Sequence, residues 1–271
     1  MKKKINVIIA NPAGNITIFV LDKFKRAEYQ DVATKLLAMK ELKGEQLSFI
    51  LKNADDCDGK MEMAGLEFCG NASRSFALIT ARRKGIQGIA DILVDVSGSS
   101  EKLTVSVNTD TNYTKIKMPQ PLSIQTLEDQ PLEVLNGGQM VDLGGIVHIV
   151  LKDVEPTEET FNEIKTYINK TYNPPAMGVM FYDTKESKLV PVVYVKDINT
   201  TYFEGSCASG STAVAVAFAQ SEDDGTYSFT LPQPAGTICS TVEKENGKLK
   251  AVYIEGPVEI GDIQTVEVDL D

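Results

Sequence analysis

The sequence of 271 residues predicts an α+β protein of two domains, each built on a mostly antiparallel sheet. Three observations support this class. Short runs that alternate apolar and polar residues are frequent, as expected of half-buried strands. Helix-like segments are fewer and lie between these runs. A stretch with three prolines and two glycines, 119–138, separates two halves that have a similar order of elements.

The strand-like runs occur in both halves of the chain. Most consist of five to eight residues rich in Val, Ile, Leu, Phe and Thr, which pack well on a pleated surface. The expected strands are 5–9, 16–22, 46–51, 91–97, 102–108, 113–118, 147–151, 188–195, 228–231 and 250–256.

Two helix-like segments are expected in each half. The first half has one over about 29–42 and one that follows Cys69 and ends at Gly85, a glycine in the position that commonly terminates helices. The second half has one over 158–170 and one that follows Cys207. In each half a cysteine therefore stands at the start of the second helix, which indicates a weak internal duplication.

These patterns define the expected domains. Residues 1–118 form an N-terminal domain that carries Cys69, and a C-terminal strand over about 264–271 is a candidate to return to it. Residues 119–263 form a C-terminal domain that carries Cys207.

The composition limits the partners. A formal net charge of −11 argues against nucleic acid or an anionic membrane as the main partner, because both require a basic surface. No apolar run approaches the roughly 18 residues of a membrane span, and the short apolar run after the first lysines is too short for a signal peptide. We expect a cytoplasmic protein. Its four cysteines lack metal-ligand spacing, so thiols are expected rather than disulfides or a metal site.

The two cysteine segments carry the chemistry. Residues 65–77 read GLEFCGNASRSFA and residues 204–216 read EGSCASGSTAVAV. At a helix N-terminus the positive end of the dipole lowers a thiol pKa, and unpaired backbone N–H groups bind a carboxylate. Two such helices directed at one cleft would hold a carboxylate from both sides and place a thiol on each face of the adjacent carbon.

That arrangement suits stereoinversion at a carbon α to a carboxylate. One thiolate removes the α-proton and the other thiol delivers a proton to the opposite face. The α-proton is weakly acidic, so the reaction needs a closed, water-free site and donors fixed on the carboxylate. No lysine motif for pyridoxal phosphate is evident, and no cofactor is expected. Cys57 and Cys239 lack a small-residue run after them, and we interpret both as structural.

These residues resemble the diaminopimelate epimerase family of cofactor-independent racemases. The run CGNA at 69–72, with Arg74, is similar to the family's first cysteine motif, and CASG at 207–210 is similar to its second. Three further segments resemble family segments in the same order, so that the similarity spans nearly the whole chain. They are 12–22, 44–51 and 142–151.

The resemblance implies two pseudo-symmetric domains with the active site in the cleft between them, no pyridoxal phosphate and no metal. It implies that Cys69 and Cys207 are the acid/base residues. It further implies a small-molecule amino-acid substrate, and relatives make a homodimer a candidate assembly. The residues implied in substrate binding are Asn15, Gln46 and the backbone N–H groups of Gly70, Asn71, Ala208 and Ser209.

Departures from the family pattern bear on the substrate. The epimerases hold the distal head of diaminopimelate with an arginine upstream of the second cysteine, but 197–207 contains none. A buried distal carboxylate without a partner would be costly. Segments 60–65 (KMEMAG) and 204–211 (EGSCASGS) instead resemble histidine racemases. Glu62 or Glu204 could accept an imidazole N–H or an ammonium group; both could equally be ordinary surface or network glutamates.

Other interpretations stay open at this point. His148, the only histidine, could tune one thiol, contact substrate, or be a core or rim residue. The chain could be a diaminopimelate epimerase with altered distal contacts, or a racemase or isomerase of another acid. It could also be an amino-acid-binding protein without activity, although binding a carboxylate requires helix N-termini and no thiols.

Overall fold

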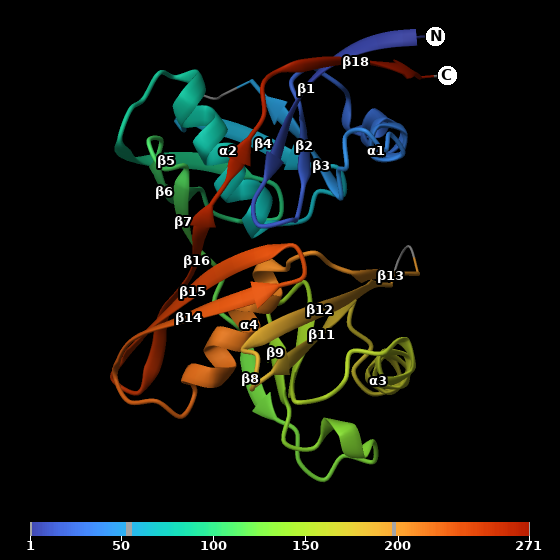
Figure 1. The fold of residues 1–271 in the computed structure, drawn as a ribbon, viewed down its shortest axis with the longest axis vertical. Coiled ribbons are helices and arrows are strands. Elements are labelled where there is room, and N and C mark those ends of the chain that lie inside the picture. The colour runs from blue at the N-terminus through green and yellow to red at the C-terminus, as the bar shows by residue number, and fades with distance from the viewer. Residues whose placement is uncertain (1, 53–55, 197–198, 271) are drawn as a thin grey trace. The chain divides into compact units, whose positions relative to one another are not determined.

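In the computed structural model the chain is described over residues 2–52, 56–196 and 199–270 (Figure 1). Met1 and Asp271, the ends of the expected domain ranges, lie outside these residues. The described chain is a mixed α+β protein, which confirms the predicted class. It forms two compact units: unit 1 comprises 1–117 with 255–271, and unit 2 comprises 118–254. No helix among the described residues is both long and apolar enough to traverse a bilayer.

Unit 1 has a sheet with strand order β7-β6-β5-β4-β3-β2-β1 and with β17 and β18 on the far side of β1. The β2–β3 and β4–β5 pairs are parallel, and the pairs β1–β2, β3–β4, β5–β6 and β6–β7 are antiparallel. The elements are β1 (Lys2–Asn11), β2 (Thr17–Val20), η1 (Arg26–Glu28), α1 (Tyr29–Leu37), β3 (Gln46–Leu51), β4 (Gly59–Met63), α2 (Gly70–Arg83), β5 (Ile89–Val96), β6 (Leu103–Asn108), β7 (Tyr113–Lys117), β17 (Glu259–Ile260) and β18 (Gln264–Asp269).

The two α-helices of unit 1 pack on opposite faces of this sheet (Figure 1). Tyr29 of α1 stacks on Phe49 of β3, with ring centroids 3.7 Å apart. On the other face Phe76 of α2 packs beside Phe19 of β2 and over Gly59 of β4, where a side chain would collide with the Phe76 ring. Residues 70–81 of α2 are all buried, so this helix forms the interior of the unit on that face.

Unit 2 has a six-stranded sheet in the order β13-β12-β11-β10-β9-β8, and a separate run β14-β15-β16. Strands β10 and β11 are parallel, and the other pairs of the six-stranded sheet are antiparallel. The elements are β8 (Ser123–Thr126), η2 (Glu133–Leu135), β9 (Gln139–Asp142), β10 (Val147–Lys152), α3 (Glu158–Thr171), β11 (Ala176–Asp183), β12 (Lys188–Val195), β13 (Thr200–Phe203), α4 (Ala208–Ala219), β14 (Gly225–Gln233), β15 (Gly236–Glu245) and β16 (Lys248–Pro257), whose last residues enter unit 1.

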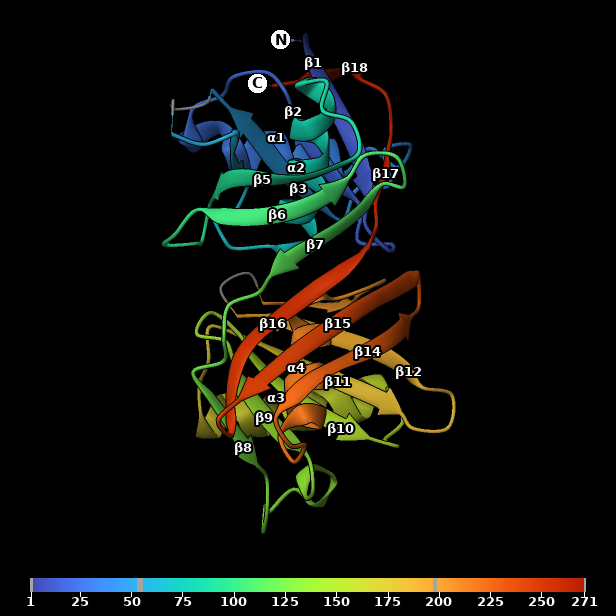
Figure 2. The same cartoon turned by 90° about the vertical axis from the view of Figure 1, so that its left-hand side faces the viewer.

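Helix α4 lies inside unit 2. It packs against β9, β10 and β11 on one side and against β14 and β15 on the other, as Figure 2 shows. Nearly all of its residues are buried because both sides are covered, and most of them are small or apolar. The outer helix α3 buries one stripe, with Phe161, Ile164 and Ile168 facing the sheet.

The order of elements recurs in the two units. In unit 1 an antiparallel strand pair leads through α1 to a strand parallel to the second, and α2 follows the next strand. In unit 2 the pair β9–β10 leads through α3 to the parallel strand β11, and α4 follows β12 and β13. In both units the cysteine immediately precedes the second, buried helix.

Candidate active site

Cys69 is the N-cap residue of α2. Its backbone is extended (φ −132°, ψ 112°), and its Sγ accepts a hydrogen bond from the Ala72 N–H at 3.4 Å. The Ser73 hydroxyl and N–H both donate to the Cys69 carbonyl, at 2.7 and 2.9 Å. The sulfur therefore occupies the position that a Ser or Asp oxygen commonly takes at a helix start, beside the first-turn amide groups that have no carbonyl partner within the helix.

The amides expected to line this site meet at the same helix end. Asn15, in the loop between β1 and β2, accepts a hydrogen bond from the Gln46 side chain at 2.5 Å and from Asn71 Nδ2 at 3.4 Å. Its own Nδ2 donates to Glu45 at 3.3 Å. Partial desolvation raises the pKa of the Glu45 carboxyl. The structure thus brings together Asn15, Gln46, Asn71 and the Cys69 helix start, and adds Glu45, which the sequence analysis did not single out.

Arg74 anchors this network from inside the protein. It is fully buried, and its Nε donates to Asn71 Oδ1 at 3.1 Å. Its Nη1 donates to the Gly256 carbonyl at 3.0 Å and to Thr114 Oγ1 at 3.3 Å. Burial lowers the pKa of Arg74 to about 10, so the side chain is a cation at neutral pH. A positive charge is therefore hydrogen-bonded to Asn71, a first-turn residue of the helix that begins after Cys69.

Cys207 caps α4 in nearly the same geometry. Its φ and ψ are −130° and 115°, and its Sγ accepts a hydrogen bond from the Gly210 N–H at 3.3 Å. Ser211 donates from its hydroxyl to the Cys207 carbonyl at 2.7 Å, as Ser73 does in unit 1. A Cβ at Gly210 would collide with the sulfur of Met180, which explains the glycine at this position.

Gln233 contacts the backbone of Cys207 and also the serine that bonds the Cys207 carbonyl. Its Oε1 accepts from the Cys207 N–H at 2.8 Å, and its Nε2 donates to Ser211 Oγ at 2.9 Å. The side chain is buried, with 5% of its surface exposed. Because Gln233 follows Cys207 by 26 residues and belongs to β14, no local sequence pattern indicated this contact.

His148 and Ser209 complete the Cys207 site. His148, on β10, is fully buried, and its Nε2 lies 2.9 Å from Ser209 Oγ. Ser209 Oγ lies 3.5 Å from Cys207 Sγ. Burial lowers the pKa of His148 to about 3, so the imidazole is neutral. The structure therefore places His148, Ser209 and Cys207 in one row of hydrogen bonds.

The expectation that the helix N-terminus lowers the thiol pKa is wrong for Cys207. Burial raises its pKa well above the ordinary value, and the negative charge of Glu204, which is also in hydrogen-bonding contact with the thiol, raises it further. The hydrogen bonds from Ser209 and Gly210 act in the opposite direction and are the smaller effect. Only 7% of the Cys207 surface is exposed, and desolvation of the thiolate outweighs the amide groups around it.

Glu62 lies apart from the Cys69 site. On β4 Gly59 lies against α2, and residues at alternate positions share its face, so that Glu62 points to the opposite face, where α1 packs. There Arg26 forms an ion pair with it, and Tyr29 donates a hydrogen bond to it at 3.0 Å. The residue is 5% exposed. In this structure its carboxylate joins η1 and α1 to the sheet.

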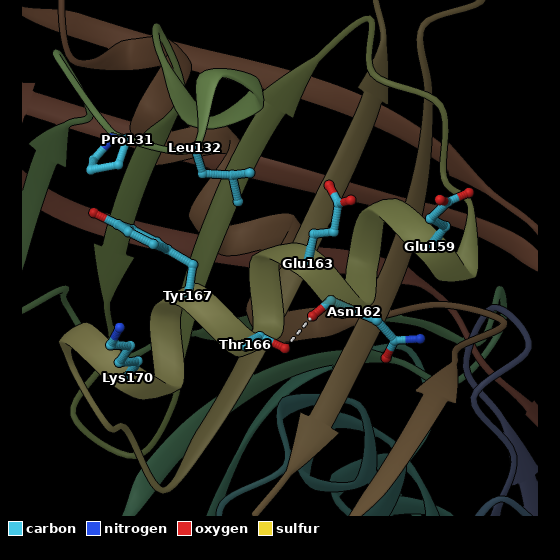
Figure 3. Close-up of a pocket in the computed structure, with 8 residues that line it drawn as sticks. All are labelled: Pro131, Leu132, Glu159, Asn162, Glu163, Thr166, Tyr167 and Lys170. Atoms are coloured by element: carbon cyan, nitrogen blue, oxygen red, sulfur yellow. Dashed lines mark hydrogen bonds between the residues drawn. The ribbon is translucent and has the colours of Figure 1, made fainter.

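Two surface hollows occur elsewhere in the described residues. One is an open groove along α3, lined by Pro131, Leu132, Glu159, Asn162, Glu163, Thr166, Tyr167 and Lys170 (Figure 3). The other lies at the C-terminal part of α2, beside Phe76, Thr80 and Lys84. Neither is lined by one of the capping cysteines, so these hollows do not mark the site that the cysteines define.

Comparisons with known proteins identify the relatives of this chain. Residues 4–263 match the family model described as "Histidine racemase CntK N-terminal domain". A histidine racemase of Fusobacterium nucleatum subsp. nucleatum is 34% identical over 268 residues, covering 94% of each chain. The histidine racemase of Staphylococcus aureus is 28% identical over 246 residues, covering 86% of this chain and 87% of that one.

The fold comparison finds a protein of similar architecture. The crystal structure of a probable proline racemase from Agrobacterium radiobacter K84, with bound carbonate, has a TM-score of 0.63 at 12% identity and covers 96% of this chain and 93% of that one. The relatives define this protein as an isomerase of the racemase class, whose substrate is a small-molecule amino acid. More specifically, the chain belongs to the histidine racemase family.

The Glu62 cluster gives a prediction about stability. The Arg26 and Tyr29 hydrogen bonds lower the pKa of Glu62 from its ordinary value of 4.5. Glu62→Gln is expected to lower the free energy of unfolding by about 1–2 kcal/mol at neutral pH, because a charged acceptor is replaced by a neutral one. A group with a depressed folded-state pKa stabilises the protein fully above the unfolded pKa, so the difference should begin to shrink as pH falls below about 4.5 and disappear below the lower folded-state pKa.

Urea unfolding at several pH values measures this difference. Glu41→Gln, at an exposed position of the same unit, is the control and should leave the free energy of unfolding unchanged. A Glu62→Gln protein as stable as wild type at neutral pH would contradict the assignment.

Gly178 gives a second prediction. A Cβ at this position on β11 would collide with Nδ1 of the buried His148. Gly178→Ala is therefore expected to lower the free energy of unfolding by about 1–3 kcal/mol and to reduce racemase activity, because the imidazole must move away from Ser209. Gly145→Ala, where no atom lies within 4 Å of the new methyl group, serves as the matched control in the same unit. Equal stability of the two variants would show that the His148 position is not constrained.

Proposed function

We propose that this racemase interconverts L- and D-histidine with Cys69 and Cys207 as its two bases. The observation that carries the proposal is the shared geometry of the two cysteines: each caps a buried helix, with its sulfur within hydrogen-bonding distance of a first-turn amide. Histidine as substrate is supported by the family and by the histidine racemases of Fusobacterium and Staphylococcus.

The reaction needs two proton transfers. The thiolate of one cysteine takes the α-proton, and the electron pair of the broken Cα–H bond passes into the carboxylate. The thiol of the other cysteine then donates its proton to the opposite face of the α-carbon and becomes the thiolate. We infer that both cysteines act on a single substrate molecule, as the diaminopimelate epimerase resemblance implies. No cofactor takes part in these steps.

The amide groups at the helix starts supply the electrostatic part. We assign the substrate carboxylate to the first-turn N–H groups of Gly70, Asn71, Ala208 and Ser209. Fixed donors of this kind stabilise the negative charge that develops on the carboxylate as the α-proton leaves. Arg74 supports this at the Cys69 site, because its cation is hydrogen-bonded to the side chain of Asn71 in the first turn of α2. Asn15 and Gln46 would contact the bound amino acid at the same helix end.

The two thiols start in different states in this proposal. Burial and Glu204 favour the protonated form of Cys207, so Cys207 is the acid of the resting enzyme and Cys69 the base. One turnover exchanges these roles, and the enzyme returns to its resting state by proton exchange. Glu204 is the acidic residue that the proposal places at the substrate, as acceptor of the ammonium or imidazole N–H. Glu62 is not assigned to substrate, because Arg26 and Tyr29 occupy its carboxylate.

The proposal predicts a mirror-image pattern for two variants. Cys69→Ser and Cys207→Ser should each lose at least about a hundredfold in racemisation, the usual contribution of one positioned acid or base. Each keeps one thiol, so each should still exchange the α-proton of one enantiomer with D2O, and the enantiomer should differ between the two variants. Mass spectrometry of separated L- and D-histidine measures both effects.

The design includes controls for the residue and for the substrate. Cys57→Ser should racemise histidine at the wild-type rate. A panel of the other common L-amino acids and diaminopimelate, incubated in D2O without pyridoxal phosphate, tests the substrate assignment. Exchange confined to diaminopimelate would contradict histidine as substrate. Near-wild-type racemisation by Cys69→Ser or by Cys207→Ser would contradict the two-base mechanism.

A further inference from the structure

The hydrogen-bonded series His148–Ser209–Cys207 determines which of its atoms carry the protons. Nε2 of His148 lies 2.9 Å from Ser209 Oγ, and that oxygen lies 3.5 Å from Cys207 Sγ. Within the described part of the chain, Nδ1 of His148 is buried and has no hydrogen-bond partner. The backbone of Gly178 lies directly beside this nitrogen and leaves no room for a side chain.

The environment of Nδ1 selects the tautomer. A neutral imidazole carries its proton on one of the two nitrogens. A proton on Nδ1 would be a buried donor without an acceptor, which is unfavourable. A proton on Nε2 instead meets the oxygen of Ser209. The Nε2–H form is therefore the stable one, and His148 donates to Ser209.

The tautomer in turn fixes the direction of the serine hydroxyl. Ser209 Oγ accepts from His148, so its single proton is available for another acceptor. Cys207 Sγ is the acceptor within reach. The sulfur already receives the Gly210 N–H, so that a thiolate at Cys207 would have two donors directed at it.

We propose that the Ser209 hydroxyl is a dedicated donor to the Cys207 thiolate, and that His148 is the positioning residue that keeps this hydroxyl pointing at the sulfur. The proposal deepens the two-base function, on which it rests, and gives the Ser209 side chain a role separate from that of its backbone N–H.

Such a donor is needed at Cys207 in particular. The sulfur is buried. Among the described residues, the negatively charged Glu204 acts on it, and that charge disfavours the thiolate. Without a compensating donor, the half-reaction in which Cys207 serves as base would be slow. At Cys69 the corresponding residue of the helix is Asn71, whose side chain bonds Asn15 and Arg74. The serine hydroxyl donor therefore serves Cys207, whereas the corresponding position beside Cys69 holds an asparagine.

Exchange in single-cysteine backgrounds tests the role of Ser209. In the Cys69→Ser background Cys207 is the remaining base, and adding Ser209→Ala should slow α-proton exchange of histidine with D2O about tenfold, which corresponds to a shift of about one unit in the thiol pKa. In the Cys207→Ser background the same substitution should slow exchange much less than tenfold, because the lost hydroxyl no longer has a thiolate to stabilise. Ser209→Thr, which keeps a hydroxyl, should restore most of the rate.

A matched control uses the next helical turn. Thr212→Val removes a buried hydroxyl that bonds the Ala208 carbonyl and does not touch the sulfur. It should not slow exchange through Cys207. An equal loss in both backgrounds, or an equal loss in Thr212→Val, would overturn the proposal in favour of a general effect on α4.

Nitrogen NMR tests the proton arrangement without any substrate. The chain has a single histidine, so the imidazole signals of ¹⁵N-histidine-labelled protein are unambiguous. A neutral ring with the proton on Nε2 is expected, and Ser209→Ala should shift the Nε2 signal because it removes the acceptor. A proton on Nδ1, or a cationic ring at neutral pH, would overturn the proposal. Should histidine show no exchange in either cysteine background, the two-base function fails while the NMR result still decides the tautomer.

Discussion

The hydrogen bond from a first-turn amide to a capping sulfur is the constraint on which the site depends. It fixes Cys69 and Cys207 at the starts of two buried helices and sets both backbones in the same extended conformation. An N-cap cysteine cannot rotate freely, because its sulfur is held by an N–H two or three residues on. The remaining amides of the first turn then stand beside the sulfur, where they can receive a carboxylate.

The surroundings of the two caps differ, and the difference is chemical. Cys69 is partly exposed and sits in a network of amides tied to a buried arginine. Cys207 is buried, beside a carboxylate and a neutral imidazole. A reaction that runs in both directions can use such a pair, since one thiol begins protonated. The duplicated architecture supplies two equivalent positions, and the side chains around them make the positions unequal.

The sequence indicated local features well and distant contacts poorly. The helix after Cys69 ends where Gly85 predicted, with that glycine at φ 71°. The helix expected over 29–42 is too long: it ends at Leu37 with Ala38 as its C-cap, and the following residues form turns in which the Met39 N–H bonds the Leu36 carbonyl and the Leu42 N–H bonds the Met39 carbonyl. Strand β11 was missed because it is buried on both faces and shows no alternation.

The same contrast between local features and distant contacts holds for the site. The small residues after each cysteine predicted two helix starts, and both are present. Gln233, Glu45 and the Arg26–Glu62 pair were not foreseen, because each acts on a partner brought near only by the folded chain. The thiol pKa of Cys207 was mispredicted for a related reason: the dipole is a local property, whereas burial depends on the strands that cover α4.

The central claim is that one cysteine removes the α-proton and a different one replaces it. The most direct measurement follows wild-type protein in D2O with L-histidine during the first few per cent of conversion. A two-base enzyme should give D-histidine that carries deuterium at the α-carbon, while the recovered L-histidine stays protonated. Deuterium entering the recovered L-histidine as fast as the product, or product that retains the original proton, would contradict the account.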